Sequence, residues 1–454
     1  MPRPSILNSV ERKFILLIGD LLIVLASLNV FIFHAIDMQF VSSSLKIGVV
    51  SVGVFSYLTL SYILNLYDLQ KTLRRKYVVT QALYITALYV FTVFIFAVIF
   101  FDVSFWRIPL LIFLILTPIQ IALWRLFFVN VFRIIPTIKN VLYIYDNYTE
   151  DNFREDVNII DGNDDSTFCK VKLTYNINQH FVVKRNFLRA TEKIDSWIIN
   201  VKNYNNLPED IEKMILKSIL KGKEVISFTS FYENTYEALP IQSHNDSFYE
   251  ILQLRNKKIR YLQTIFGFSI NFALALIVGL FFLLCTPFVW ICNLIFNKGP
   301  LFYTQKRVGL HGKEFKIYKF RSMVVDAEKA GAKMAVKNDA RITPFGKILR
   351  AFRIDELPQI ISVVKGDMQF IGPRPERKVF VNQLNDRVPF YAARHLIRPG
   401  ITGWAQVKYK YGENLDDSIK KLEYDLYYIK NRSITLDIRI VFKTVTTVLF
   451  SRGM

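Results

Sequence analysis

The apolar segment FGFSINFALALIVGLFFLLCTPFVWICNLIF, residues 266–296, decides how this chain meets a membrane. Its 31 residues would extend about 46 Å as an α-helix, which exceeds the ~30 Å hydrocarbon core of a bilayer. Basic residues flank both ends, with Arg260 before the segment and Lys298 after it. Because Lys and Arg near membrane segments favour the cytoplasmic side, a single crossing would satisfy only one of the two flanks.

The segment contains its own break at Thr286-Pro287. Proline removes a backbone donor and bends a helix, and the threonine hydroxyl can bond a freed carbonyl. The sequence therefore favours a re-entrant hairpin, bent at Thr286 and Pro287, that enters and leaves the membrane by the same face. The alternative is a kinked fifth span with the C-terminal region on the opposite side.

Four further apolar segments precede this one, each about 20 residues or longer and so long enough to span a bilayer. They lie at residues 14–33, 47–66, 82–101 and 108–131. Basic residues gather before the first segment and after the second and fourth, which predicts that both ends of this unit are cytoplasmic. Asp20 interrupts the first segment; such a carboxylate can be functional, but packing or capping is the favoured interpretation.

Composition agrees with a membrane protein that has a large basic soluble part. The chain has 454 residues, 52% of them hydrophobic, three cysteines and a net charge of +20. This hydrophobicity excludes a disordered chain, and three cysteines exclude a disulfide scaffold. Residues 137–245 carry 13 basic and 16 acidic residues, whereas residues 266–454 carry 30 and 15. This asymmetry predicts two soluble regions with different roles.

The first soluble region shows a helix and strands of an α/β unit. Strand-like runs lie at residues 140–145, 197–201 and 224–228, and a helix is expected over residues 209–220. A dinucleotide site needs a glycine-rich turn after the first strand, but here the turn contains Asp146-Asn147 and no glycine. We therefore expect a Rossmann-like domain without nucleotide binding, whose role is packing, dimerisation or regulation.

The second soluble region contains an adjacent acid pair, Asp355-Glu356, in a basic and apolar context. Neighbouring residues of a helix do not face each other, so the two carboxylates should have different roles. Arg350 and Arg353 precede the pair and should keep a carboxylate ionised, as a nucleophile or metal ligand must be. On this pair alone, an ordinary salt-bridged surface pair is the favoured alternative.

Arg374 strengthens the case for a phosphate site, since prolines on both sides hold its main chain at a fixed angle and a guanidinium fork suits phosphate. The alternative is an exposed turn held by its prolines. Lys319 and Arg321 would add charge from one face of a strand over residues 315–320, or would be solvated surface charge.

No zinc-type Cys/His spacing occurs, and the membrane segments argue against nucleic acid as a partner. Basic residues beside the hairpin suit lipid phosphates instead. Residues 434–450 are either an interfacial or a core helix.

These motifs together resemble those of the bacterial sugar transferase family, the polyprenyl-phosphate hexose-1-phosphate transferases or monotopic phosphoglycosyl transferases, over residues 262–454. KFRSM at 319–323, DELPQ at 355–359, GPRPE at 372–376 and PGITGWAQV at 399–407 carry the resemblance. The long form of the family implies four transmembrane helices at residues 1–136 and a Rossmann-like cytoplasmic domain at residues 137–250. A basic linker with the re-entrant membrane helix would follow at residues 251–298, and an α/β catalytic domain at residues 299–454.

The resemblance implies an enzyme of the bacterial inner membrane with a cytoplasmic catalytic domain. It would move a hexose-1-phosphate from a UDP-sugar to undecaprenyl phosphate, releasing UMP, and start exopolysaccharide, capsule or O-antigen (lipopolysaccharide) assembly. By the same resemblance Asp355 is the nucleophile, Asp355 and Glu356 hold Mg²⁺ or Glu356 activates the acceptor, and Arg350 and Arg374 bind phosphate. The expected partners are the two substrates, inner-membrane lipid and, through the middle domain, a second copy of the chain.

Overall fold

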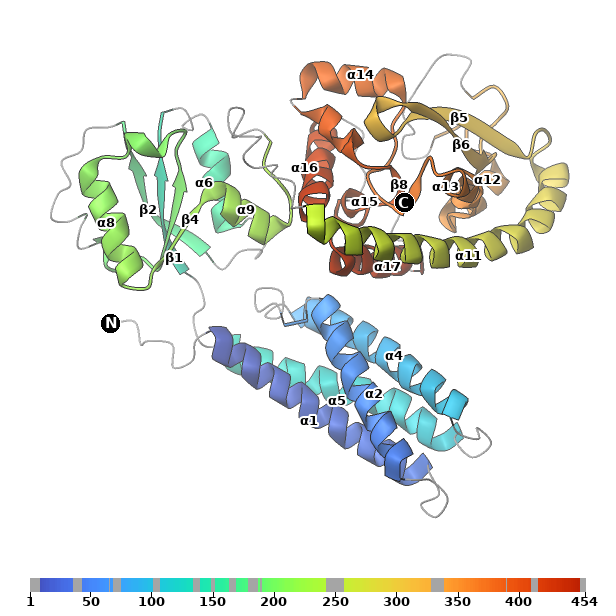
Figure 1. Cartoon of the computed structure of the whole chain (residues 1–454), viewed down its shortest axis with the longest axis horizontal. Helices are drawn as coiled ribbons and strands as arrows, with labels where there is room; N and C mark the ends of the chain where they lie inside the picture. The colour runs from blue at the N-terminus through green and yellow to red at the C-terminus, as the bar shows by residue number, and fades with distance from the viewer. Residues whose placement is uncertain are drawn as a thin grey trace. The chain divides into compact units, whose positions relative to one another are not determined.

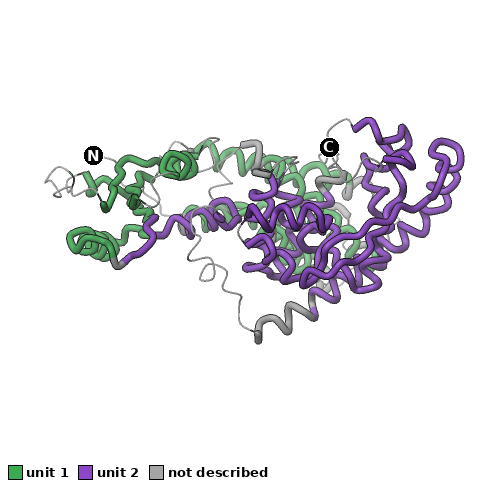
Figure 2. Tube along the Cα trace, turned by 90° about the horizontal axis from the view of Figure 1, so that it is seen from above, with its two compact units in different colours: residues 1–199, 205–225 green, residues 200–204, 226–454 purple. Residues whose placement is uncertain are grey.

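The computed structural model describes the chain in separate ranges. These are residues 9–35, 43–64, 66–67, 75–100, 107–133, 139–147, 152–162, 169–178, 187, 190–241, 257–327, 339–388, 390–409 and 415–449. The chain divides into two compact units, residues 1–199 with 205–225 and residues 200–204 with 226–454 (Figure 2). The basic residues Arg3, Lys71, Arg74 and Arg255, on which part of the topology prediction depends, lie outside the described ranges.

Four apolar helices occupy the N-terminal region, as predicted (Figure 1). They are α1 (Ser9–Ala35), α2 (Ser43–Ile63), α4 (Arg75–Phe100) and α5 (Arg107–Arg133). Among the described residues, stretches of α1, α4, α5 and the later α11 are long and apolar enough to cross a membrane. The corresponding stretch of α2, Lys46–Tyr62, is shorter.

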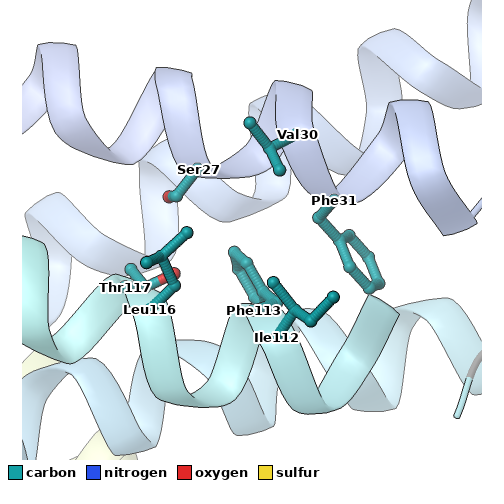
Figure 3. A pocket seen from close by; sticks show the side chains of 7 residues that line it. All are labelled: Ser27, Val30, Phe31, Ile112, Phe113, Leu116 and Thr117. Atoms are coloured by element: carbon teal, nitrogen blue, oxygen red, sulfur yellow. The ribbon is translucent and has the colours of Figure 1, made fainter. Parts of the chain in front are cut away.

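A buried ion pair lies inside this helical bundle. Asp20 on α1 accepts hydrogen bonds from Arg125 on α5, through Nε at 3.1 Å and through Nη2, and both side chains are fully buried. Arg125 also donates from Nη1 to the carbonyl of Leu66 at 2.9 Å. Nearby, α1 and α5 face each other with apolar side chains, and the rings of Phe31 and Phe113 stack at 4.8 Å (Figure 3). Asp20 thus joins α1 to α5 through an ion pair, which agrees with the packing role favoured from the sequence.

The middle region contains a four-stranded sheet in the order β2-β1-β3-β4, with β1 and β2 parallel. Its strands are β1 (Lys139–Tyr145), β2 (Cys169–Asn176), β3 (Ser196–Asn200) and β4 (Glu224–Ser227). Helices α6 (Phe153–Asp161) and α8 (Glu209–Leu220) and the 3₁₀ turn η3 (Tyr204–Asn206) connect them. The predicted strands and the helix over residues 209–220 are confirmed, whereas β2 and α6 went unpredicted.

The C-terminal region combines short helices with two small sheets. An antiparallel hairpin joins β5 (Phe302–Val308) and β6 (Glu314–Phe320), and β7 (Gln369–Ile371) pairs in parallel with β8 (Gly400–Thr402). Its helices are α12 (Pro344–Ala351), α13 (Ile360–Val364), α14 (Lys378–Arg387), α15 (Trp404–Lys408), α16 (Leu415–Asn431) and α17 (Ile434–Leu449). Three 3₁₀ helices complete it: η4 (Leu310–Gly312), η5 (Ile354–Gln359) and η6 (Tyr391–Leu396). Glycines let β7 and β8 approach, because a Cβ on Gly400 would lie 2.1 Å from the nitrogen of Gly372.

The membrane segment forms a single helix, α11 (Lys257–Phe296), which continues through Pro287. The hydroxyl of Thr286 donates to the carbonyl of Phe282 at 2.6 Å, one residue before the carbonyl that proline cannot bond. The predicted re-entrant arrangement, bent at Thr286 and Pro287, thus corresponds to one continuous helix in secondary structure.

One face of α11 contacts the C-terminal region from Ile270 to Cys292 (Figure 1). Asn271 accepts the backbone N–H of Phe370 at 2.7 Å, and Val289 is buried beside Phe345. The opposite face exposes large apolar side chains, among them Phe268, Phe272, Leu276, Leu283, Phe288 and Ile295. Helix α17 buries Leu436 and Ile440 in the same core cluster that residues of α11 contact, whereas Val445 is exposed.

The segment of residues 228–241, which begins with α9 (Phe228–Tyr236), belongs to the same compact unit as the C-terminal region. Tyr232 donates to Glu423 on α16 at 2.7 Å. Glu237 accepts from Arg439 at 2.7 Å, and its carbonyl accepts the indole N–H of Trp404 at 2.9 Å. This segment therefore packs with the C-terminal region, although the sequence assigned it to the domain ending at residue 250.

Candidate active site

The acid pair lies on η5, directly after α12. Thr343 caps α12 by accepting the N–H of Gly346 at 3.0 Å, which fixes where that helix begins. Arg353 has a left-handed backbone, with φ of 57°, and this turn ends the helical path and starts η5. As a result, Asp355 and Glu356 both lie in the interior of the domain, where Asp355 is 6% exposed and the side chain of Glu356 is 11% exposed.

Glu356 is surrounded by positive charge. Its Oε1 accepts from Nη2 of Arg374 at 2.6 Å and from Nζ of Lys319 at 3.1 Å, and Nη1 of Arg353 lies 4.0 Å away. Burial alone would raise the pKa of Glu356, but Arg374 and Lys319 outweigh it and hold that pKa well below its usual range. Glu356 is therefore an ionised carboxylate that gathers three cations at one point.

Asp355 has a different environment. Its Oδ1 is buried and has no hydrogen-bond partner among the residues that the structure describes. Burial, followed by the negative charge of Glu356, raises the pKa of Asp355 to about 6. The expected stabilising effect of Arg350 and Arg353 is present but smaller than the cost of burial. The two carboxylates therefore differ in role, as their adjacency predicted, and Asp355 is the one with a free acceptor oxygen.

The structure brings some of the predicted phosphate-binding residues together and places others elsewhere. Lys319 and Arg374 meet at Glu356, whereas Nε of Arg350 donates to the hydroxyl of Ser322 at 2.9 Å. Arg321 lies at the C-terminal end of α11, where it donates to the carbonyl of Pro300 at 2.8 Å and to the carbonyl of Asn297. Since β6 ends at Phe320, Arg321 does not continue the face that carries Lys319.

Sequence reasoning gave no site role to two arginines near Arg374, the buried Arg394 and the partly buried Arg307. Arg394, on η6, donates to the main-chain carbonyl of Arg374 at 2.9 Å, and Arg307, on β5, donates to that of Pro375 at 3.2 Å. Neither stands in one of the motifs that drew attention. Arg307 follows Lys306 in a polar stretch and Arg394 precedes His395, and neither pattern indicates a contact with a turn that is distant in sequence.

A divalent cation fits this site through Asp355. Among the described residues, no group of three or more His, Cys, Asp or Glu side chains is arranged to hold a metal ion. Mg²⁺ is commonly bound by one or two carboxylates together with substrate phosphates and waters, so it does not require such a group. The unpartnered Oδ1 of Asp355 is the kind of oxygen that this mode of binding uses.

The acid pair is enclosed by Lys and Arg on a domain that packs against an apolar helix, and such an arrangement suits phosphorylated ligands. Comparison with known proteins gives the class a name: residues 262–451 match the family described as bacterial sugar transferase. With the relatives described next, this match shows that the chain belongs to the bacterial sugar transferase family.

Three relatives illustrate the match. The UDP-N-acetylgalactosamine-undecaprenyl-phosphate N-acetylgalactosaminephosphotransferase of Aeromonas hydrophila is 52% identical over 157 residues, covering 35% of this chain and 37% of that protein. The UDP-glucose:undecaprenyl-phosphate glucose-1-phosphate transferase of Xanthomonas campestris pv. campestris is 46% identical over 156 residues, covering 34% and 32%. The uncharacterized sugar transferase EpsL of Bacillus subtilis is 38% identical over 187 residues, covering 39% and 87%. The chain thus aligns with about a third of the first two relatives and with most of the third.

Proposed function

We propose that this protein transfers a hexose-1-phosphate from a UDP-sugar to undecaprenyl phosphate and releases UMP. The observation that carries the proposal is the convergence of Lys319 and Arg374 on Glu356 beside the unpartnered Asp355. Phosphoryl transfer depends mainly on positioning and charge neutralisation, which this arrangement provides. The names of the Aeromonas and Xanthomonas relatives support the same two substrates.

In the proposed reaction Asp355 is the nucleophile. A carboxylate oxygen of Asp355 attacks the phosphorus next to the sugar, the bond from that phosphorus to the UMP oxygen breaks, and UMP leaves with the electron pair. An oxygen of undecaprenyl phosphate then attacks the same phosphorus, and the bond to Asp355 breaks to restore the carboxylate. With a pKa of about 6, Asp355 is mostly ionised at neutral pH and can act without a separate base.

Glu356 and its cations would serve this reaction by holding charge in place. Glu356 fixes the guanidinium of Arg374 and the ammonium of Lys319 on one side of Asp355, where the donor phosphates would bind. Mg²⁺, held by Asp355 and Glu356 as the family resemblance implies, would neutralise phosphate charge when bound. Arg350, which contacts Ser322 beside the site, is proposed as a further phosphate ligand.

We also propose that both ends of α11 lie on the cytoplasmic side of the inner membrane, so that the helix is re-entrant. Support comes from the contacts between one face of α11 and the C-terminal domain from Asn271 to Val289. A helix that crossed the bilayer would carry these contacts into the hydrocarbon, whereas a helix embedded in one leaflet presents only its exposed apolar face to lipid. This arrangement lets a soluble donor and a lipid-bound acceptor meet at one surface.

The middle region is proposed to be a degenerate Rossmann-like domain that binds no nucleotide. Its sheet order, β2-β1-β3-β4, supports this, as does the glycine-free turn Asp146-Asn147 that follows β1. A role in forming a homodimer is part of the same proposal. The pathway step would be the first membrane-bound one in exopolysaccharide, capsule or O-antigen assembly.

One assay separates the main alternatives. Membranes containing the protein are incubated with UDP-sugars, undecaprenyl phosphate and Mg²⁺, and the released nucleotide is identified. UMP supports the proposal, UDP indicates a glycosyltransferase that moves the sugar alone, and neither nucleotide favours a non-enzymatic scaffold that binds anionic lipid. For topology, a single cysteine introduced at Lys298 should resist a membrane-impermeant thiol reagent added from the periplasmic side; labelling there would contradict the re-entrant arrangement.

A further inference from the structure

The turn that carries Arg374 is anchored through its carbonyl oxygens. The prolines on both sides of Arg374 have no N–H, so this stretch offers few donors by which neighbouring elements could hold it. The turn has four successive carbonyls, from Pro373 to Glu376, and the first and last accept from main-chain N–H groups. The N–H of Gly400 donates to the carbonyl of Pro373 at 3.0 Å, and the N–H of Val308 donates to the carbonyl of Glu376 at 2.9 Å. Strands β8 and β5 therefore fix the two ends of the turn.

The inner two carbonyls accept from side chains. Nη2 of Arg394 donates to the carbonyl of Arg374 at 2.9 Å, and Nη1 of Arg307 donates to the carbonyl of Pro375 at 3.2 Å. The two arginines come from η6 and β5, which approach the turn from different parts of the domain. All four successive carbonyls of the turn are thus held by another element.

Each of these arginines has a carboxylate partner. Arg394 is 7% exposed and pairs with Asp425, which is 2% exposed, at 2.9 Å. Arg307 pairs with Glu376 at 3.3 Å. A buried ion pair contributes little to stability compared with apolar side chains of similar size. What an apolar pair could not replace is the hydrogen bond from the guanidinium to the turn.

We propose that Arg394 and Arg307 are positioning residues, which hold the main chain of Arg374 so that its guanidinium meets Glu356 and the donor phosphates. Arg374 lies 2.6 Å from Glu356, and this contact depends on where the turn places its Cα atom. The inference rests on the proposed function, because it takes the sugar-nucleotide phosphates as the ligand of Arg374. Among the described residues, neither arginine forms a hydrogen bond or ion pair with Asp355 or Glu356.

The first test removes the buried pair as a whole. In the double variant Arg394→Met with Asp425→Leu, no charge remains buried without a partner, so the domain should fold. UMP release should fall about 10- to 100-fold, since a displacement of about 1 Å in a positioning group can reduce rate by 10²-fold. We expect kcat to fall more than KM rises, because the donor still binds but its phosphates are less well aligned. The matched control, Arg387→Met at the exposed end of α14, should retain full turnover.

A double-mutant cycle distinguishes positioning from a general structural role. When Arg374 is already replaced by Ala, adding Arg394→Met with Asp425→Leu should reduce turnover little further, because the residue being positioned is gone. Additive losses would mean that the pair acts independently of Arg374 and would overturn the inference, as would a folded double variant with wild-type turnover.

Arg307→Met supplies a second route to the same turn if the double variant does not fold, since its partner Glu376 remains partly exposed. It should show the same dependence on Arg374, and additivity there would equally contradict the inference. Absence of UMP release by the wild-type protein would count against the proposed function instead. The positioning role would then be tested by UDP binding in a calorimeter: the affinity should fall in the Arg394 and Arg307 variants only while Arg374 is present.

Discussion

The membrane bundle and the C-terminal domain each bury an acid beside arginine, yet the two groups differ in how completely their charges are matched. In the bundle, Arg125 donates to both oxygens of Asp20 and to one backbone carbonyl. In the domain, Glu356 alone faces three cations, while the adjacent Asp355 has an oxygen without a partner among the described residues. A completed network holds structure, whereas an excess of cations beside an unmatched acid is suited to a phosphorylated ligand.

The largest effect should come from the unmatched acid. Asp355→Asn should reduce UMP release at least about 10³-fold, equivalent to roughly 4 kcal/mol, because the amide is a poor nucleophile. The melting temperature should change little, since Oδ1 of Asp355 has no hydrogen bond to lose. Steady-state UMP release and thermal unfolding in detergent measure the two effects. Asp386→Asn, on the exposed side of α14, is the matched control, and retention of a tenth of the activity by Asp355→Asn would contradict the nucleophile assignment.

Breaking the matched pair of Asp20 and Arg125 in the bundle should reduce stability and leave turnover unchanged. Asp20→Asn leaves Arg125 buried without its counter-charge and should destabilise the bundle by about 3 kcal/mol. UMP release per folded molecule should stay near the wild-type value, because the pair has no part in the proposed reaction. Denaturation of the purified protein in detergent measures the first quantity.

Adding Arg125→Met to Asp20→Asn should recover part of the lost stability, since the double variant contains no unpaired charge. If Asp20→Asn instead lost turnover while remaining folded, the distinction between a completed structural pair and an open functional one would fail.

The motif positions were predictable from the sequence, but the way their charges pair was not. Lys319 and Arg374 lie 37 and 18 residues away from Glu356, so no local spacing indicates that they meet there. The sequence assigned Arg350 and Arg353 to the acid pair and Lys319 and Arg374 to phosphate, and burial outweighs the influence of Arg350 and Arg353 on the pKa of Asp355. Which cation serves which carboxylate is a property of the tertiary packing.

Arg321 shows the same limit at the level of secondary structure. Strand alternation placed it on the face of Lys319, but β6 ends at Phe320, one residue too early. From there Arg321 turns to the end of α11 and bonds the carbonyls of Asn297 and Pro300. The apolar helices and the strands of the middle sheet were predictable because the hydrophobic pattern of a segment indicates its secondary structure. The residue at which a strand ends depends instead on the elements that pack against it.

A third acid, Glu237, tests what distinguishes a structural acid from a functional one. The alternatives are whether cations match its charge and whether it lies in the same unit as the active site. Glu237 lies in the same compact unit as the active site, but Arg439 and Lys408 match its charge. Glu237→Gln should lower the stability of that unit by about 2 kcal/mol, the typical loss for hydrogen bonds to a charged group. Turnover per folded molecule should change less than twofold.

The control for Glu237 is Glu224→Gln, which breaks an exposed pair with Lys139. Exposed pairs contribute about 1 kcal/mol or less, so its melting temperature should hardly move. Thermal unfolding of both variants gives the comparison, and a large loss of turnover in folded Glu237→Gln would show that a matched acid can still serve catalysis.

The smallest effect is expected at His395, whose unpartnered Nε2 can be compared with the unpartnered Oδ1 of Asp355. Asp355 lies beside the cations that converge on Glu356, and this is the difference that the last prediction tests. Nε2 of His395 is buried without a partner among the described residues, and burial lowers the pKa of His395 to about 4. Between pH 6.5 and 4 the unfolded chain takes up a proton at this position and the folded chain does not, so folding stability falls as the pH decreases through that range. Because the ring is only partly buried, we expect about 1 kcal/mol rather than the full value of the shift. His395→Gln should flatten this part of the pH dependence of thermal unfolding and leave UMP release at neutral pH unchanged. A loss of turnover in the folded variant would contradict this distinction. It would mean that a buried polar atom without a partner indicates a functional residue even away from the cations that surround the acid pair.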